Sequence, residues 1–225
     1  MNKYLLDEVE EQYEDRINFS KYIFKGLEKE IRIVHFNETE NIVQFDQPLD
    51  HLYLIIEGKA KVTMVHENGK RSIVRFLTPM ELIGELSLIE VDDQPKDIQA
   101  VSSCTCLAVP ITMAKKILLK DCEFLLKLNQ YIGEKLLERT WFQMKFQNYE
   151  LKNRLAAYML MSEHNGLYTE KHTETAEYLN VSYRHLLHTI KLFLNDDIIK
   201  KTQQGYVLNM DVLSELSMDI LDKRF

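Results

Sequence analysis

The chain has 225 residues, with 28 Lys and Arg against 35 Asp and Glu, which gives a net charge of −7 with histidine neutral. This acidity excludes a generally basic protein that coats nucleic acid without regard to sequence. Hydrophobic residues make up 45% of the chain and aromatic residues 10%. Such a chain can bury a core, so intrinsic disorder is excluded as well.

The compartment is indicated by what the sequence does not contain. The longest purely apolar runs, such as Leu52–Ile56, are much shorter than a membrane span. The acidic start has neither the basic nor the apolar segment of a signal peptide, so we expect a cytoplasmic protein with no membrane partner. Three cysteines make a poor disulfide framework and suit a reducing compartment.

The negative charge is concentrated in the first part of the chain. Residues 151–225 hold 9 basic and 10 acidic side chains, which leaves −6 for residues 1–150. Six carboxylates and no base lie between Asp7 and Asp15. A solvated helix face explains this run better than a dedicated binding tail. The C-terminal third is therefore nearly neutral.

From about Ile31 to Val109, short alternating apolar stretches are separated by turn residues. Lys59–Met64 places Ala, Val and Met on one face and Lys and Thr on the other, which predicts a half-buried strand. Asn68-Gly69 suits a type I′ hairpin turn, after which Ser72–Phe76 resumes the alternation. The pattern is typical of a small antiparallel barrel or sandwich.

From Thr112 to about Asn148, leucines recur at helical spacing. A helix of about 25 residues would be about 37 Å long. Its apolar stripe, the candidate dimer interface, consists of Leu125, Leu128, Ile132 and Leu136. Two-chain pairing through this stripe is favoured, and packing of the stripe on its own barrel is the alternative.

The C-terminal region reads as helices followed by a hairpin. The expected elements are helices over Leu151–Ser162, Glu174–Leu179 and Tyr183–Leu194, then strands Ile198–Thr202 and Tyr206–Leu208 around Gln204-Gly205.

The second and third of these helices fit a helix-turn-helix. Ala176 is small enough for two helices to approach closely, and Asn180 tolerates the left-handed geometry of a turn. Ser182 is placed to cap the next helix. Arg184 then stands near the start of that helix.

The helix after Ser182 has two opposed faces. At 100° per residue, Arg184, His188 and Lys191 fall within about 60° of one another. Leu186, Ile190 and Phe193 lie on the opposite side. A recognition helix needs this arrangement, with its apolar side on the scaffold and its cationic donors in a major groove.

We predict that this helix contacts DNA, with Arg184 able to pair bidentately with guanine O6 and N7. The other candidate DNA contacts are Ser182, Tyr183, His185, His188 and Lys191 on the helix and Lys200 and Lys201 on the hairpin. The alternative is an ordinary amphipathic surface helix with solvated cations. The turn chemistry, the small residue and the opposed faces together favour DNA binding.

The whole chain resembles the Crp/Fnr superfamily of bacterial transcription regulators. The likeness rests on Leu52–Gly58, Ile83–Leu88 and the helix-turn-helix. It implies an α+β fold with a cyclic-nucleotide-binding-like β-roll, a long dimerisation helix and a winged helix-turn-helix. The implied domains are a sensor over residues 1–110 that includes an N-terminal helical segment, a helical region over 111–149, and a DNA-binding domain over 150–225.

The C-terminal motifs Asn153–Ala157, Glu170–Thr173 and Ala176–Leu187 look like the YeiL-type branch. The resemblance implies a homodimer on a pseudo-palindromic operator. It also implies RNA polymerase contact, expected at His164–Tyr168 and Glu67–Lys70. In the cyclic-AMP receptor branch an acidic base-reading residue stands where this chain has Arg184, so the operator should differ.

The resemblance places an effector pocket at the turn that contains Gly84, Glu85, Leu86 and Ser87. In cyclic-nucleotide binders of the family an Arg-Ser pair then neutralises the phosphate, but here Gln94, Pro95 or Lys96 stands at the arginine position. Asp92, Asp93 and Asp97 would repel a phosphodiester. The adenine-contacting positions map to Arg139 and Thr140. We therefore do not expect control by cyclic AMP, and the pocket is either vestigial or used by an unknown small molecule.

An Fnr-type iron–sulfur cluster is not expected, because it needs four thiolates and the chain has three cysteines, none before Cys104. Cys104 and Cys106 face the same side of a predicted strand. They could sense oxidants or bind a soft metal, but small core residues are favoured, and Cys122 is expected to pack in a helix.

Enzymatic chemistry is not expected. His35, His51 and His66 lack partners at metal-ligand spacing, so a metalloenzyme is disfavoured and no metal site is predicted. The sequence contains no phosphate loop, nucleophile elbow or paired-carboxylate motif. The alternative to a DNA-binding regulator is a small-molecule-binding regulatory module that acts through protein contacts.

Overall fold

The computed structural model describes residues 23–67, 71–91 and 96–221. The acidic run Asp7–Asp15 and the Asn68-Gly69 turn lie outside these residues. The chain forms two compact units: the first ends at Lys135 and the second begins at Leu136, with Arg71–Val74 also grouped in the second. No helix among the described residues is long and apolar enough to cross a membrane.

Two four-stranded sheets build the β-roll. The first has the order β1 (Arg32–Phe36), β8 (Cys104–Pro110), β3 (His51–Glu57) and β6 (Leu82–Ile83). The second has the order β2 (Asn41–Val43), β7 (Lys96–Ala100), β4 (Ala60–Val65) and β5 (Arg71–Leu77). β8 pairs antiparallel with both β1 and β3. The predicted strand over Lys59–Met64 is confirmed as β4, shifted by one residue.

The core of the first unit lies between the first sheet and the helices that follow it. The short helix α3 (Glu85–Leu88) comes directly after β6, and α4 (Ile111–Leu118) directly after β8. Leu52 and Leu107 from the sheet are fully buried, as is Phe124 from the next helix. Alternation along the strands thus directs one face inward, as the sequence pattern indicates.

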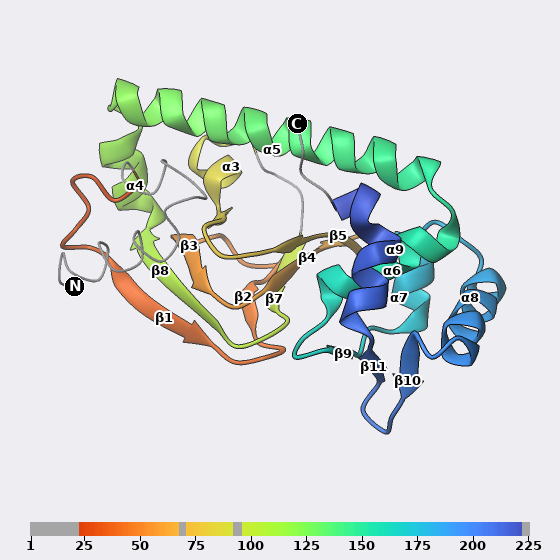
Figure 1. The fold of residues 1–225 in the computed structure, drawn as a ribbon. Coiled ribbons are helices and arrows are strands. Elements are labelled where there is room, and N and C mark those ends of the chain that lie inside the picture. The colour runs from red at the N-terminus through yellow and green to blue at the C-terminus, as the bar shows by residue number, and fades with distance from the viewer. Residues whose placement is uncertain (1–22, 68–70, 92–95, 222–225) are drawn as a thin grey trace. The chain divides into compact units, whose positions relative to one another are not determined.

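The helical region after Thr112 contains two helices, and the second is the predicted long helix. α4 ends at Leu118, and α5 (Cys122–Asn148) is a single helix of 27 residues (Figure 1). Asp121 causes the new start, because its Oδ1 accepts hydrogen bonds from the backbone N–H groups of Phe124 at 3.2 Å and Glu123 at 2.9 Å. These bonds lower the pKa of the Asp121 carboxyl.

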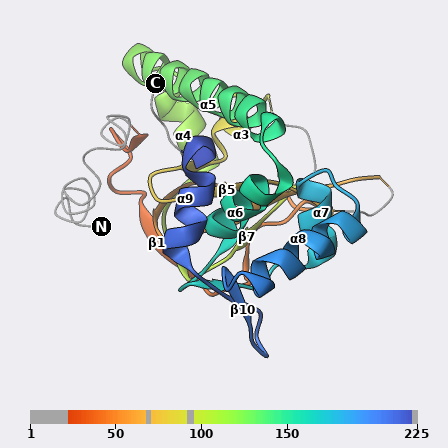
Figure 2. The same cartoon turned by 45° about the vertical axis from the view of Figure 1, so that its right-hand side comes forward.

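The second unit is a winged helix-turn-helix, as predicted. Its helices are α6 (Leu151–Ser162), α7 (His172–Tyr178), α8 (Tyr183–Asn195) and α9 (Met210–Leu221). Its strands β10 (Ile199–Lys201), β11 (Tyr206–Leu208) and β9 (Leu167–Tyr168) form one sheet in that order. α7 and α8 lie side by side, and the β10–β11 hairpin projects next to α8 (Figure 2).

Helix α9 was not predicted from the sequence. It packs on α6 and buries Leu213, Ser217 and Ile220. Asn153 on α6 donates a hydrogen bond from Nδ2 to the carbonyl oxygen of Leu216, at 2.8 Å. α9 therefore completes the core of the second unit.

The leucine stripe on α5 packs mainly on its own β-roll. Leu128 is 2% exposed within the core, and Leu125 and Ile132 pack against that core. Leu136 is 64% exposed. Three of the four residues therefore pack on the chain's own β-roll, which was the alternative to two-chain pairing.

The two ends of the stripe should respond differently to truncation. Leu128→Ala should lower the free energy of unfolding by about 2–5 kcal/mol, because it leaves a cavity in a packed core. Leu136→Ala should change the stability of the monomer by less than about 0.5 kcal/mol. Urea unfolding at several protein concentrations measures both effects. An equal, concentration-independent loss for the two variants would contradict this placement.

Candidate functional site

The start of α8 is fixed by local hydrogen bonds. The Ser182 hydroxyl accepts a hydrogen bond from the backbone N–H of His185 at 3.2 Å, so Ser182 is the N-cap residue. In the preceding turn Asn180 has a φ of 51°, and the backbone N–H of Val181 donates to the carbonyl of Ala176 at 3.0 Å. Ala176, Asn180 and Ser182 thus lie in the turn as the sequence indicates, and they set the direction of α8.

Burial separates the two faces of α8. Leu186, Ile190 and Phe193 are buried, each at most 3% exposed. The predicted DNA-contacting residues of the helix and its cap, Ser182, Tyr183, Arg184, His185, His188 and Lys191, are all exposed. The cations therefore share one accessible surface, and the apolar residues hold the helix on its domain.

The hairpin carries the other two predicted contacts. Lys200 and Lys201 on β10 are exposed, whereas the adjacent Ile199 is buried and anchors the strand. A side chain at Gly205 would collide with the carbonyl oxygen of Tyr168 on the neighbouring strand. Glycine is thus required for the hairpin to approach β9 closely.

A set of rings joins the hairpin to the helix-turn-helix. The His172 ring, at the start of α7, lies 5.7 Å from the Tyr206 ring on β11 and 6.5 Å from the Tyr183 ring on α8. Burial lowers the pKa of His172, and the nearby Lys201 cation lowers it further. This contact fixes the hairpin lysines relative to the first turn of α8.

Arg154 supports the turn between α7 and α8 and was missed as a functional residue. Its Nη1 donates to the carbonyl oxygen of Leu179 at 2.9 Å, where α7 ends. Its guanidinium also lies 5.8 Å from the centre of the Phe146 ring. Asn153 and Arg154 belong to the motif Asn153–Ala157, so that motif holds α9 and the turn in place. The motif marked these two residues in the sequence, but it did not indicate what they contact, because Leu216 and Leu179 are distant along the chain.

The turn that carries the predicted effector residues lies in the first unit. Gly84 has a φ of 101°, and a side chain there would collide with Leu49 Cδ2. Leu86 and Ser87 follow in α3, where their carbonyl oxygens accept backbone hydrogen bonds. This backbone geometry requires a glycine at the turn.

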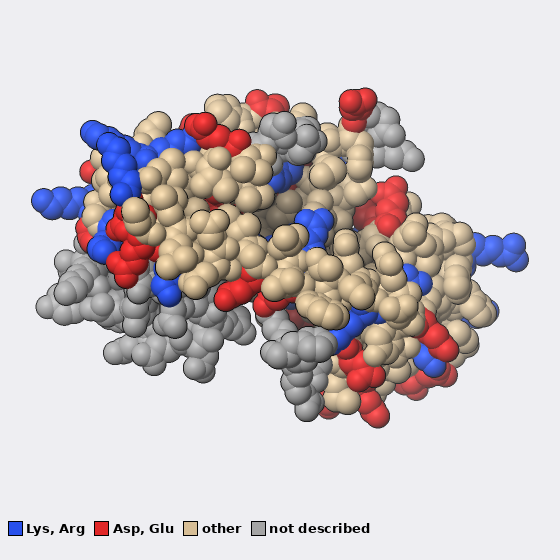
Figure 3. Space-filling model, turned by 90° about the horizontal axis from the view of Figure 1, so that it is seen from above, with Lys and Arg blue, Asp and Glu red and all other residues tan. Residues whose placement is uncertain are grey.

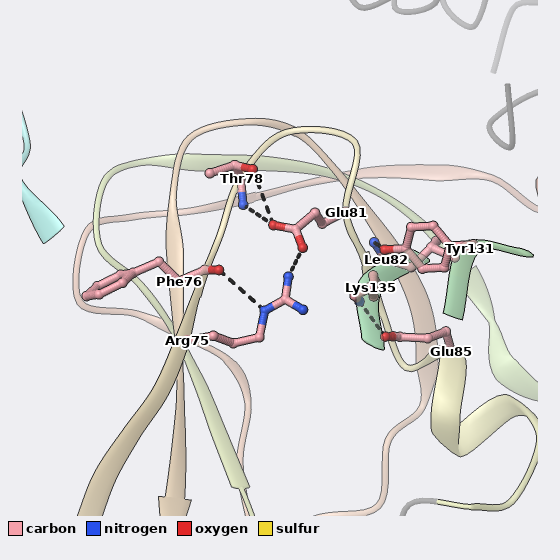
Figure 4. A network of polar contacts seen from close by, with 8 residues as sticks. All are labelled: Arg75, Phe76, Thr78, Glu81, Leu82, Glu85, Tyr131 and Lys135. Atoms are coloured by element: carbon pink, nitrogen blue, oxygen red, sulfur yellow. Dashed lines mark hydrogen bonds and ion pairs between the residues drawn. The ribbon is translucent and has the colours of Figure 1, made fainter. Parts of the chain in front are cut away.

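Glu85 is engaged by the chain itself. Its Oε1 lies 2.6 Å from Nζ of Lys135 on α5 (Figure 4). The side chains of Lys135 and Glu85 are only 18% and 12% exposed. Burial lowers the pKa of Lys135, and the Glu85 carboxylate opposes that shift. Sequence reasoning did not find Lys135, because 50 residues separate it from Glu85.

Lys96, another predicted pocket residue, lies near enough to Lys135 for its positive charge to lower the pKa of Lys135. Lys96 begins β7 opposite Met64, while Asp92, Asp93, Gln94 and Pro95 lie outside the described residues. Asp97 is buried, and its Oδ1 accepts a hydrogen bond from the backbone N–H of Phe45 at 3.0 Å. Its carboxylate therefore has a structural role.

Arg139 and Thr140 are exposed and belong to the part of α5 grouped with the second unit. The Thr140 hydroxyl donates to the carbonyl oxygen of Leu136 at 2.8 Å. That donor is therefore used within the helix, as is common for threonine in helices.

The cysteines differ in accessibility. Cys104 and Cys106 are buried, and burial raises the pKa of the Cys104 thiol to about 11 and that of Cys106 to about 12. Cys122 is exposed at the start of α5, so the expectation that it packs in a helix core is wrong. Among the described residues no group of three or more His, Cys, Asp and Glu could hold a metal ion.

Comparison with known proteins identifies the family. A model of the cyclic nucleotide-binding domain matches residues 33–121. The regulatory protein YeiL of Escherichia coli O157:H7 is 36% identical over 203 residues, which cover 90% of this chain and 93% of YeiL. The global nitrogen regulator of Synechococcus elongatus is 23% identical over 133 residues, or 58% of this chain and 60% of that protein.

A solved structure has the same fold. A transcriptional regulator of the CRP family from Thermus thermophilus has a TM-score of 0.64 at 17% identity, covering 85% of this chain and 100% of that one. The chain therefore belongs to the Crp/Fnr superfamily of bacterial transcription regulators. Within that superfamily it is a relative of YeiL. Its relatives are regulators and not enzymes.

The burial of the cysteines predicts their reactivity. In the native protein at neutral pH, a thiol reagent such as DTNB should modify one cysteine quickly, and Cys122→Ser should remove that reaction. Cys104 and Cys106 should react only on unfolding, since they are buried and protonated. Fast modification of either remaining thiol in Cys122→Ser would contradict this.

Proposed function

We propose that this protein is a sequence-specific DNA-binding regulator that acts as a homodimer on a pseudo-palindromic operator. The observation that carries the proposal is the division of α8 into a buried apolar face and an exposed basic face, next to the hairpin lysines. Arg184, in the first turn of α8, would read a guanine in the major groove. Lys200 and Lys201 would contact the phosphate backbone.

Exposed apolar residues on α5 support the homodimer. Leu137, Trp141 and Met144 recur at spacings of four and three residues, and Leu136 lies beside them. Such a stripe on a long helix is typical of a helix–helix interface. A second copy of α5 would cover it and would place the two recognition helices about 34 Å apart on DNA.

Specific binding would rest on few contacts. On the face of the molecule seen in Figure 3, Lys and Arg side chains are interspersed with Asp and Glu. The net charge of −7 also opposes non-specific attraction to DNA. Affinity should therefore depend on the basic face of α8 and on the hairpin, with a weak non-specific background.

RNA polymerase is the partner proposed for transcription activation. The turn at His164–Tyr168 is anchored by buried Tyr168 and presents exposed Asn165. Of the second proposed contact, Glu67–Lys70, residues 68–70 lie outside the described residues. The family membership supports this part of the proposal, and no enzymatic activity is proposed.

The sharpest test is to select operators from random DNA with the wild-type chain and with Arg184→Ala. Loss of the guanidinium should weaken binding to the wild-type operator by about 1–3 kcal/mol and relax the preference at one symmetric pair of positions. Lys120→Ala, which removes an exposed cation in the turn after α4, is the control and should change neither. An unchanged selected sequence for Arg184→Ala would refute the role of Arg184.

We also propose that cyclic AMP is not the effector. Lys135 already pairs with Glu85, and no arginine stands at the phosphate-pairing position in the sequence. Calorimetric titration with cyclic AMP should give no saturable heat at micromolar concentration, and operator affinity should be the same with and without it. A micromolar dissociation constant would contradict the proposal.

Steep salt dependence of duplex binding would distinguish a DNA regulator from a module that acts only through protein contacts.

A further inference from the structure

Two side chains of α5 hold the turn between β6 and α3. Tyr131 Oη accepts a hydrogen bond from the backbone N–H of Leu82 at 2.9 Å, and Lys135 pairs with Glu85. Tyr131 and Lys135 are one helical turn apart, so they lie on the same side of α5. They therefore contact Leu82 and Glu85, which lie on the two sides of Gly84 (Figure 4).

The two side chains of α5 also contact each other. Lys135 Nζ lies 4.8 Å from the centre of the Tyr131 ring, which supplies a second favourable contact for the ammonium group. The chain before the turn is also held, because Glu81 pairs with Arg75 and accepts a hydrogen bond from the backbone N–H of Thr78 at 2.7 Å.

The contacts of Lys135 attach α5 to the β-roll close to the point where the helix leaves the first unit. Lys135 is the last α5 residue grouped with the first unit, and Leu136 is the first grouped with the second. The Glu85–Lys135 pair therefore attaches α5 to the turn of the β-roll at the end of the α5 segment that is grouped with the first unit.

Both members of the pair are largely buried, so separating them would leave two charges poorly solvated. A small molecule can shift a conformational equilibrium only by binding one state better than the other. The chain's own side chains already close this turn, so an effector that acts by closing it would have less of the equilibrium left to shift.

We propose that the Glu85–Lys135 pair takes the place of a bound effector, so that α5 stays attached to the β-roll and operator binding needs no small molecule. This inference rests on the proposed DNA-binding function. Glu85 and Lys135 act as positioning residues, and neither contacts DNA. Their effect on DNA affinity passes through the attachment of α5.

The test compares the full-length wild type with Lys135→Met and with the neutral pair Glu85→Gln/Lys135→Met. Lys135→Met should weaken operator binding about tenfold, within the usual range for coupling between distant sites. Amide hydrogen exchange at residues 82–88 should rise in the same variant. The neutral pair leaves no unpaired charge, so it should fold even if the single variant does not, and should show the same two effects.

Charge reversal and a surface pair provide the controls. Glu85→Lys/Lys135→Glu should recover part of the operator affinity that Lys135→Met loses, because it restores opposite charges at the two positions but not the contact of the ammonium group with the Tyr131 ring. Lys115→Met removes the exposed Lys115–Glu90 pair in the same unit, and should change neither affinity nor exchange at residues 82–88.

Two results would overturn the inference. One is unchanged exchange at residues 82–88 and unchanged affinity in the neutral pair. The other is wild-type protein that binds its operator only when a cell metabolite extract is added. If the wild type binds no duplex above background under either condition, the proposed function fails, whereas the exchange measurement still reports on the attachment of α5.

Discussion

The burial of one face of α8 is the constraint on which the second unit depends. Leu186, Ile190 and Phe193 each contribute about 1.5–3 kcal/mol when fully buried. Rotating the helix about its axis would expose them and force Arg184 and Lys191 toward the core, where unpaired charges are much less stable. The orientation of the basic face therefore follows from the packing of the apolar one. The remaining elements hold this arrangement: Arg154 at the turn, His172 between hairpin and helix, and α9 behind α6.

The first unit depends on a comparable interaction at its turn. Glu85, which follows the tight turn at Gly84, pairs its carboxylate with Lys135 from the chain's own long helix. Because Lys135 is buried beside Tyr131, the attachment is both electrostatic and aromatic. The turn thereby becomes part of the mechanical connection between β-roll and α5.

Local sequence signals predicted much of the fold. α6 and β11 have the bounds predicted for them, and α8 extends the prediction by one residue, because Ser182 and the hairpin residues act over a few positions. The two faces of α8 also followed from spacing alone. The long helix of about 25 residues followed from leucine spacing and is confirmed as α5, which has 27 residues. Its start after Asp121 was not predicted, because the carboxylate that accepts the first backbone N–H groups is not part of the apolar pattern.

Interactions between distant positions could not be read from one sequence. Glu85 was recognised through its motif, but nothing local marks Lys135 as its partner. Arg154 and Leu179 are likewise 25 residues apart. The leucine stripe shows the limit of periodicity: it identifies an apolar helix face, but it does not say whether the β-roll or a second chain covers that face.

Methylation interference on a selected operator tests the central claim most directly, because a methyl group on guanine N7 blocks contacts in the major groove. We predict two symmetric guanines, about one helical turn apart, whose methylation prevents binding of the wild type, and loss of that sensitivity in Arg184→Ala. Binding that is indifferent to N7 methylation at every guanine would contradict major-groove recognition by α8.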